Sequence, residues 1–304
     1  MTTIKIIQGN CLEVLKEMPE QSVNTCVTSP PYWGLRDYGE SDQLGLEDTP
    51  EEYVANMVAV FKEVKRVLRD DGTVWLNLGD SYSSGGRTTT TNQTLRGDKD
   101  YGATRPKPSK NIKQKDLIGI PWRVAFALQA DGWYLRQDII WHKPNPMPES
   151  VKDRCTKAHE YIFLLSKNSK YYYDNEAIKE PAKDWGTRDR TKGKYHNKGT
   201  GLTPHTGLEK SYPTKNKRSV WTVTTKPFKG AHFAVFPMDL IEPCVLAGCP
   251  ENGTVLDPFG GAGTTGLVAN KNKRNAVLIE LNSDYIDIAE DRIHNTLRQK
   301  CLDI

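Results

Sequence analysis

The chain has 304 residues, of which 37% are hydrophobic, enough to bury the core of one large domain or two small ones. It contains no run of eighteen apolar residues and no apolar leader segment, so we expect a soluble, cytoplasmic protein and exclude a membrane-spanning one. The formal net charge of +4 is too small to indicate a polyanionic partner unless the charge is concentrated locally.

Strand and helix patterns alternate along the chain, which predicts an α/β fold with a doubly wound sheet and helices on both faces. Expected strands are, in chain order, 4–8, 23–28, 73–78, 134–141, 161–166, a strand at Val255 and 276–279. Expected helices are 50–68, closed by Asp70-Asp71-Gly72, then 117–130, 239–247, one after the glycines near 263, and 284–297. Residues 134–141 and 161–166 alternate apolar side chains like a hairpin at a sheet edge, so the expected sheet is mixed.

Directly after the second strand comes the tetrapeptide Ser29-Pro30-Pro31-Tyr32. Proline has no backbone N–H and a fixed φ, so these carbonyls are acceptors without a competing donor, beside a hydroxyl and an aromatic ring. This combination is suited to bind a planar amino group, because such a ligand needs two hydrogen-bond acceptors and a flat surface to stack on. A proline-rich turn without a ligand is the alternative, because Ser, Pro and Tyr are ordinary turn residues.

A second motif, Asp257-Pro-Phe-Gly-Gly-Ala-Gly-Thr-Thr-Gly266, predicts strand, glycine loop and helix. Gly261, Gly263 and Gly266 allow a tight turn and close ligand approach, and Glu280 ends the next apolar run, where a carboxylate suits a ribose diol. The spacing also satisfies the dinucleotide fingerprint, so a nicotinamide-dependent oxidoreductase remains an alternative.

Together the two motifs resemble those of the DNA amino methyltransferases, which use S-adenosylmethionine to methylate cytosine N4 or adenine N6. The resemblance runs from Ile4 to about Leu297, and the catalytic motif precedes the cofactor loop, which is the order of the family's β group. It implies a Rossmann-like methyltransferase fold, a catalytic role for Ser29, Pro30, Pro31 and Tyr32, and no metal. The six cysteines agree with that, since they form no CxxC pair and have no histidine cluster nearby.

For the cofactor, S-adenosylmethionine, the resemblance implies a site that includes Asn10, Phe233, Ala234, Asp257, Phe259, Gly261, Gly263, Thr264 and Glu280. Asp257 would bind the donor's amino group and Thr264 its carboxylate, near a helix N-terminus. Core packing is an equal alternative for Phe236. The family commonly has Gly-Asp after the first strand, whereas this chain has Gly9-Asn10, which leaves the role of Asn10 open.

Two basic segments predict where double-stranded DNA binds. Residues 168–230 hold 14 lysines and arginines against 6 acidic residues, and residues 82–116 hold 8 against 3. Both lack periodic apolar positions, and aromatic residues interleave with the cations of the first segment. We expect 168–230 to be the target-recognition region and 82–116 an accessory DNA-contacting loop, with solvated flexible surface as the alternative. The flanking parts, 1–167 and 231–304, would be the catalytic and cofactor-binding halves of the methyltransferase domain.

Serine at position 29 favours cytosine N4, because the family's adenine enzymes mostly carry Asp or Asn there. We therefore expect a site-specific DNA methyltransferase that flips its target base, with adenine N6 as the alternative base. A catalytically inactive DNA-binding regulator is a further alternative. A homodimer and a separate restriction nuclease are possible partners that the sequence leaves open.

Overall fold

An eight-stranded sheet forms the centre of the structure, a computed structural model that describes residues 2–35, 37–40, 42–83, 112–182, 213–226 and 236–302. The strands lie in the order β1-β10-β9-β2-β3-β5-β4-β8. All neighbours run parallel except β5, which is antiparallel to both β3 and β4. The bounds are β1 Ile4–Gln8, β2 Val23–Thr28, β3 Leu68–Leu78, β4 Tyr134–His142, β5 His159–Ser166, β8 Val220–Thr222, β9 Thr254–Asp257 and β10 Asn275–Glu280. The predicted doubly wound mixed sheet is confirmed.

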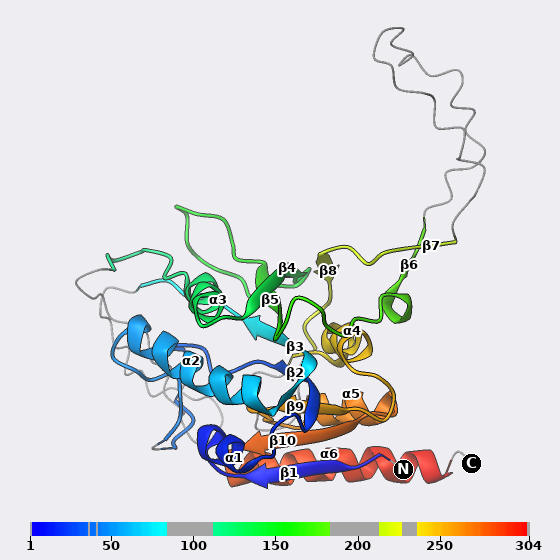
Figure 1. The fold of residues 1–304 in the computed structure, drawn as a ribbon. Helices are drawn as coiled ribbons and strands as arrows, with labels where there is room; N and C mark the ends of the chain where they lie inside the picture. Colours follow the sequence, from blue (N-terminus) through cyan, green and yellow to red (C-terminus); the bar gives the residue numbers. More distant parts are fainter. Residues whose placement is uncertain are drawn as a thin grey trace, which may run out of the picture.

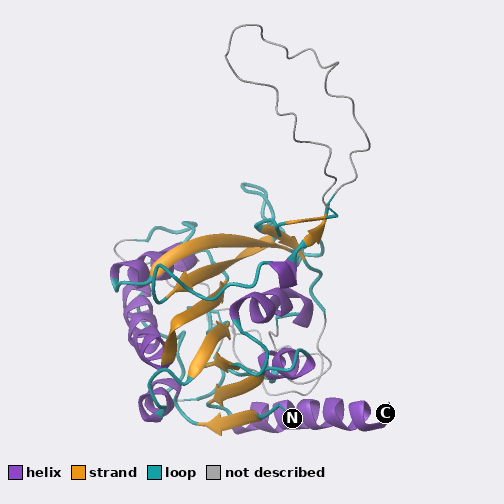
Figure 2. Cartoon of the chain, turned by 45° about the vertical axis from the view of Figure 1, so that its right-hand side comes forward, coloured by secondary structure: helices purple, strands orange, loops and turns teal. Residues whose placement is uncertain are grey.

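Helices cover both faces of this sheet, as Figures 1 and 2 show. On one face lie α1 (Cys11–Glu17), α2 (Pro50–Val67) and α3 (Ile120–Ala130), and on the other α4 (Met238–Gly248), α5 (Thr264–Lys271) and α6 (Ser283–Leu302). A 3-10 turn, η1 (Glu176–Ile178), and a small two-stranded sheet of β6 (Glu180–Pro181) and β7 (Thr214–Lys215) lie apart from the main sheet.

Each face of the sheet has its own hydrophobic core. Side chains of β2 alternate between them: Cys26 belongs to the core beneath α1, α2 and α3, and Val27 to the core beneath α4 and α5. Both residues are at most 1% exposed. A strand buried on both faces is typical of the centre of a parallel sheet, and it accounts for the continuous apolar run of β2.

Strands from opposite ends of the chain are neighbours in the sheet. Ile6 of β1 pairs with Leu278 of β10, and Cys26 of β2 pairs with Leu256 of β9. After β2 the chain turns to α2 on one face, and after β9 it turns to α5 on the other. This divergence makes the carboxyl edge of β2 and β9 a topological switch point, where ligands bind in open α/β sheets.

Three helix and strand boundaries differ from expectation. Helix α1 was not predicted, although Asn10 accepts a hydrogen bond from the Leu12 amide as its N-cap at 2.9 Å. Helix α3 begins at Ile120 instead of residue 117, because the Asp80 carboxylate accepts from the Gly119 and Ile120 amides. Strand β3 begins at Leu68, so the expected stop after the preceding helix lies inside a strand.

The hairpin of β4 and β5 is confirmed, but its expected place at the sheet edge is wrong. Residues Val220–Thr222, inside the segment assigned to target recognition, pair in parallel with Ile140–His142 and form the edge as β8. Trp221 is 5% exposed and donates its indole N–H to the Arg218 carbonyl. A three-residue strand has too little periodicity to be predicted from sequence.

Much of both basic segments, namely 84–111 and 183–212, lies outside the described residues. Within the described parts, Cys11, Cys26, Cys155, Cys244 and Cys249 are free thiols. The same parts contain no cluster of three His, Cys, Asp or Glu side chains suited to a metal ion. None of their helices has the length and apolar character required to span a bilayer.

Candidate active site

A pocket opens at the switch point, between the loops that follow β1, β2, β9 and β10. The sequence-predicted residues that line it are Asn10, Ser29, Pro31, Asp257, Phe259, Gly261, Thr264 and Glu280. Pro30, Tyr32 and Gly263 lie outside the lining, and Phe233 and Ala234 lie outside the described residues. The two sequence motifs, more than two hundred residues apart, therefore meet at one pocket.

Asp257 is the most buried charged side chain that lines the pocket, 1% exposed at the end of β9. Its carboxylate accepts from the hydroxyls of Thr28 and Thr265, each at 2.6 Å, and from the Phe259 amide at 3.1 Å. Burial raises the pKa of Asp257 above its ordinary value, and these hydrogen bonds oppose that shift. The carboxylate thus ties β2 to the glycine loop and to the first turn of α5.

Glu280, at the end of β10, fixes the other side of the glycine loop. Its Oε2 accepts from the Gly261 amide at 2.7 Å, and its Oε1 accepts from the Asn282 amide at 2.9 Å. Burial raises the pKa of Glu280, while these amides lower it. A carboxylate has about four acceptor positions, so two bonds leave capacity on both oxygens for a ligand in the pocket.

Gly263 and Thr264 form the start of α5. Gly263 has φ +76°, and a Cβ built there would lie 2.9 Å from Ala289 Cβ, so glycine lets α6 pack against this turn. Thr264 is 3% exposed and accepts from the Arg292 guanidinium at 3.3 Å. The first backbone amides of α5 lie here at a helix N-terminus, which is a favourable place for an anionic group.

Several pocket residues were missed by the sequence analysis. They come from the loop between β2 and α2 and from the start of α6: Tyr38, Glu40, Asp42, Gln43, Leu44, Asn282 and Tyr285. The side-chain amide of Asn282 donates to Glu40 Oε1 at 3.1 Å. The rings of Tyr38 and Tyr285 meet edge to face, with their centres 6.2 Å apart. No periodicity in this loop indicated that it folds over the pocket. For Phe236 the sequence did not decide between core packing and contact with the cofactor. In the structure it lines the pocket and also packs on the core.

The tetrapeptide presents different groups in two directions. Ser29 lies in the pocket, and the Pro31 carbonyl accepts from the Tyr53 hydroxyl at 2.8 Å. The Pro30 carbonyl accepts no hydrogen bond from the described residues. The Tyr32 ring lies against Gly79, where a Cβ would come within 2.6 Å of Tyr32 Cε2.

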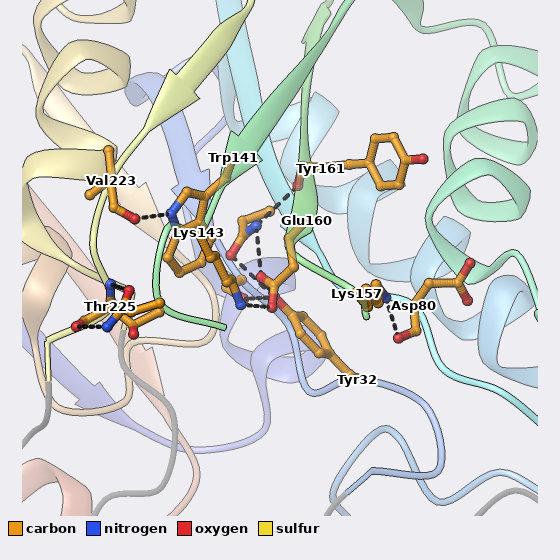
Figure 3. Close-up of polar contacts among 12 residues, drawn as sticks. Tyr32, Asp80, Trp141, Lys143, Lys157, Glu160, Tyr161, Val223 and Thr225 are labelled. Atoms are coloured by element: carbon orange, nitrogen blue, oxygen red, sulfur yellow. Dashed lines mark hydrogen bonds and ion pairs between the residues drawn. The ribbon is translucent and has the colours of Figure 1, made fainter. Parts of the chain in front are cut away.

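The Tyr32 hydroxyl enters a polar cluster made by β3, β4 and β5 (Figure 3). It contacts Glu160 Oε2 at 2.9 Å and Asn77 Oδ1 at 3.1 Å, and Glu160 Oε1 forms an ion pair with Lys143. Burial raises the pKa of Tyr32 well above its ordinary value, so the phenol stays protonated. Sequence reasoning did not identify Asn77 or Glu160, because Asn77 is a lone polar residue near the apolar end of β3 and Glu160 stands directly before the apolar run of β5.

His142 is the last residue of β4, and Lys143 follows it. The sequence did not decide whether these two side chains contact phosphates or are ordinary polar residues at a strand end. The Lys143 ammonium pairs with Glu160 and lies 4.2 Å from the centre of the Trp141 ring. His142 Nδ1 is 3.2 Å from the Thr222 hydroxyl of β8. Both side chains thus have partners within the fold.

A doubly wound sheet with a glycine loop, a buried acidic strand end and a second carboxylate on the next strand is the arrangement expected of an S-adenosylmethionine-dependent methyltransferase. The DNA methylase family model for N6 and N4 amino methyltransferases matches residues 23–291. The chain belongs to this family.

Curated relatives match over nearly the whole length. The type II methyltransferase M.SmaI of Serratia marcescens is 49% identical over 296 residues, covering 96% of this chain and 91% of that protein. M.Cfr9I of Citrobacter freundii is 49% identical, covering 95% and 87%.

Solved structures share the fold at lower identity. The cytosine-N4-specific PvuII DNA methyltransferase has a TM-score of 0.64 at 20% identity, covering 95% of this chain and 86% of that one. TTHA0409 of Thermus thermophilus, a putative DNA modification methylase complexed with S-adenosyl-L-methionine, has a TM-score of 0.61 at 23% identity, covering 96% and 95%. At these identities the likeness concerns the fold.

Proposed function

We propose that this DNA methyltransferase transfers a methyl group to N4 of a cytosine flipped out of double-stranded DNA. The observation that carries the proposal is Ser29 in the pocket. The next residue in the chain is Pro30, whose carbonyl accepts no hydrogen bond from the described residues. Two acceptors at this point suit the two hydrogens of an exocyclic amine. Serine at this position favours cytosine over adenine, and the PvuII enzyme of the same fold is cytosine-N4-specific.

The donor pocket fits S-adenosylmethionine by the chemistry of its lining. Glu280 retains acceptor capacity for a ribose diol, and Phe259 and Phe236 offer apolar surface to a flat purine. Thr264 and the start of α5 suit the donor's carboxylate. Asp257, with three internal hydrogen bonds, holds the loop in shape and has less free capacity for the donor's amino group. When bound, S-adenosylmethionine supplies a methyl group on a sulfonium centre.

Ser29 and Pro30 then prepare the amine. The N4 lone pair of cytosine is delocalised into the ring, and acceptors for both amino hydrogens shift the nitrogen towards sp³ geometry, which makes it a better nucleophile. The Tyr32 ring remains the predicted stacking surface for the flipped base, worth about 1–3 kcal/mol in related sites. After transfer the methylated amine loses one proton to water.

DNA binding in this proposal rests on the segments 82–116 and 168–230. Their basic excess would neutralise phosphates, and binding should then weaken with salt by a log-log slope of about −0.9 per phosphate. The relatives are type II methyltransferases, so a restriction partner and a protective role in the cell belong to the same proposal. A homodimer stays a prediction that size measurement in solution would test.

Incubation of the protein with labelled S-adenosylmethionine and DNA, followed by analysis of the modified bases, tests the proposal directly. We expect N4-methylcytosine at one short sequence. N6-methyladenine would replace the proposed base, while donor binding without any transfer would favour the inactive regulator. Calorimetry with S-adenosylhomocysteine and with NAD separates the donor from a nicotinamide cofactor.

A further inference from the structure

A chain of hydrogen-bonding side chains leads from the pocket into the interior of the protein. The Ser29 hydroxyl lies 3.3 Å from the Tyr32 hydroxyl, which lies 2.9 Å from Glu160 Oε2. Glu160 in turn forms the ion pair with Lys143 (Figure 3). The chain therefore links the first residue of the tetrapeptide to a carboxylate on β5, 131 positions later in the sequence.

The surroundings of Tyr32 decide the direction of these bonds. Asn77 Nδ2 donates to the Tyr161 carbonyl at 3.0 Å, which turns Asn77 Oδ1 towards the Tyr32 hydroxyl at 3.1 Å. Tyr32 thus faces two acceptors, Asn77 Oδ1 and Glu160 Oε2, and must donate its single proton to them. Its lone pairs are left to receive the proton of Ser29.

Glu160 is the fixed end of this arrangement. Its side chain is 15% exposed and that of Lys143 is 19% exposed, so the carboxylate is largely withdrawn from water and is paired with the Lys143 ammonium. The Lys143 ammonium also lies over Trp141, whose indole N–H donates to the Val223 carbonyl at 2.8 Å. An ionised carboxylate can only accept, which makes it a reliable orienting group for a phenol.

The direction matters because a serine hydroxyl can either donate or accept. A hydroxyl proton pointing into the pocket would repel the hydrogens of an amine. With its proton committed to Tyr32, Ser29 turns its lone pairs away from Tyr32 and leaves them for the amine, and no group of the described residues donates to Ser29 Oγ.

We propose that Glu160 is a positioning residue for methyl transfer, acting through Tyr32 to hold the Ser29 hydroxyl as an acceptor for the target amine. The inference rests on the proposed function of Ser29 and names a residue beyond the tetrapeptide. Glu160 touches neither donor nor base in this arrangement. Its effect is on the rate of transfer and not on the affinity for S-adenosylmethionine.

Glu160→Gln tests the inference in the full-length protein. The new amide oxygen must face the Lys143 ammonium, so its NH2 group faces Tyr32 and competes with Ser29 for the Tyr32 lone pairs. Single-turnover transfer of labelled methyl to DNA should slow by about tenfold to a hundredfold, the range for a lost hydrogen bond to a charged group. Affinity for S-adenosylhomocysteine and KM for DNA should stay close to wild type, whereas the melting temperature should fall because the Lys143 ammonium loses its counter-charge.

Tyr32→Phe provides the second arm, because it keeps the ring and the Lys143–Glu160 ion pair but removes the relay. If Glu160 acts through Tyr32, adding Glu160→Gln to Tyr32→Phe should cause no further slowing. Glu149→Gln is the matched control, since Glu149 is also ion-paired, to Arg154 at 2.6 Å, on the connection between the same two strands. It should transfer methyl at the wild-type rate.

Wild-type kinetics in Glu160→Gln, or multiplicative losses in the double variant, would overturn the inference while leaving the methyltransferase assignment intact. An equal loss in Glu149→Gln would overturn it as well. A wild-type protein that binds the donor but methylates no DNA would instead refute the proposed function, and the inference with it.

Discussion

The two halves of the candidate active site are built in different ways. On the donor side, Asp257 accepts from the Phe259 amide and Glu280 from the Gly261 amide, all within a single strand-loop-helix-strand unit. On the acceptor side, Tyr32 meets Asn77 and Glu160 from strands 45 and 128 residues away. The donor half is held mainly by hydrogen bonds within this unit, with the bond from Thr28 of β2 to Asp257 as a long-range addition, whereas the acceptor half depends entirely on strand order in the sheet. Substitutions should therefore separate donor binding from methyl transfer.

The strongest test of this separation is Ser29→Ala. Loss of one acceptor at the reacting amine should lower the rate of transfer by about 10²- to 10³-fold, as for removal of one transition-state hydrogen bond in other enzymes. Donor affinity should not change, because the glycine loop makes no hydrogen bond to Ser29 among the described contacts. Labelled-methyl transfer and calorimetry measure the two quantities. Ser22→Ala, on the exposed turn before β2, is the control, and undiminished turnover in Ser29→Ala would refute its assignment.

Glu280→Gln should mainly weaken donor binding, in contrast to Ser29→Ala, which should mainly slow methyl transfer. A glutamine side chain has one oxygen and cannot accept from the amides of Gly261 and Asn282 and from a ribose diol together. We expect donor affinity to fall by about tenfold to a hundredfold. Calorimetry with S-adenosylhomocysteine checks this, with Glu242→Gln on α4, paired to Lys271 at 2.9 Å, as control. Unchanged affinity would remove Glu280 from the cofactor site.

Gly263→Ala tests whether the turn before α5 requires glycine because of its close packing against α6 or only because of its positive φ. Gly119 has a similar φ of +79° with no atom within 4 Å of a built Cβ, so Gly119→Ala should cost about 1 kcal/mol of unfolding free energy. Gly263→Ala adds the contact with Ala289 and should cost about 2–4 kcal/mol. Denaturant unfolding of both variants measures the difference. Equal costs would show that α6 yields to the extra methyl group.

The smallest expected effect is that of Asp257→Asn on the pH dependence of stability. Burial raises the pKa of Asp257 above its ordinary 3.8, so the folded state binds this proton more tightly than the unfolded state. The resulting stability is fully present below about pH 3.8 and is lost as the pH rises through the raised folded pKa.

Asp257→Asn removes this contribution and one of the acceptors, which should cost about 1 kcal/mol at neutral pH and more in acid. Urea unfolding of both proteins at about pH 7 and at about pH 4.5 compares the two costs. A cost that shrinks in acid would contradict the raised pKa.

Prediction from sequence succeeded where the signal was local. The glycine loop, the acidic end of β9 and Glu280 lie within about 24 residues, and their spacing alone placed them at one strand edge. The sequence left the role of Asn10 open, and only the structure shows its side chain capping α1. The edge strand β8 was not predicted, because three residues carry too little periodicity to be recognised as a strand.

The acceptor side shows the opposite case. Ser29-Pro-Pro-Tyr32 was recognisable, yet its partners were not, since Asn77 is a lone polar residue at the apolar end of β3 and Glu160 only precedes the apolar run of β5. Nothing in the sequence around them indicates which strand is their neighbour. The loop between β2 and α2 is similar: it folds over the pocket through Glu40 and Asn282, a contact between residues 242 positions apart.

By itself, the sequence determined the doubly wound α/β class, the glycine loop after Asp257 and the position of the tetrapeptide Ser29–Tyr32 after a strand. Each of these depends on residue types at short, fixed spacings. Only the tertiary structure decided that β5 lies between β3 and β4 and brings Glu160 to Tyr32. Strand order is set by which apolar faces pack best over the whole sheet, and that choice cannot be read from any one segment. The direction of the hydrogen bonds from Ser29 to Glu160 follows from that choice.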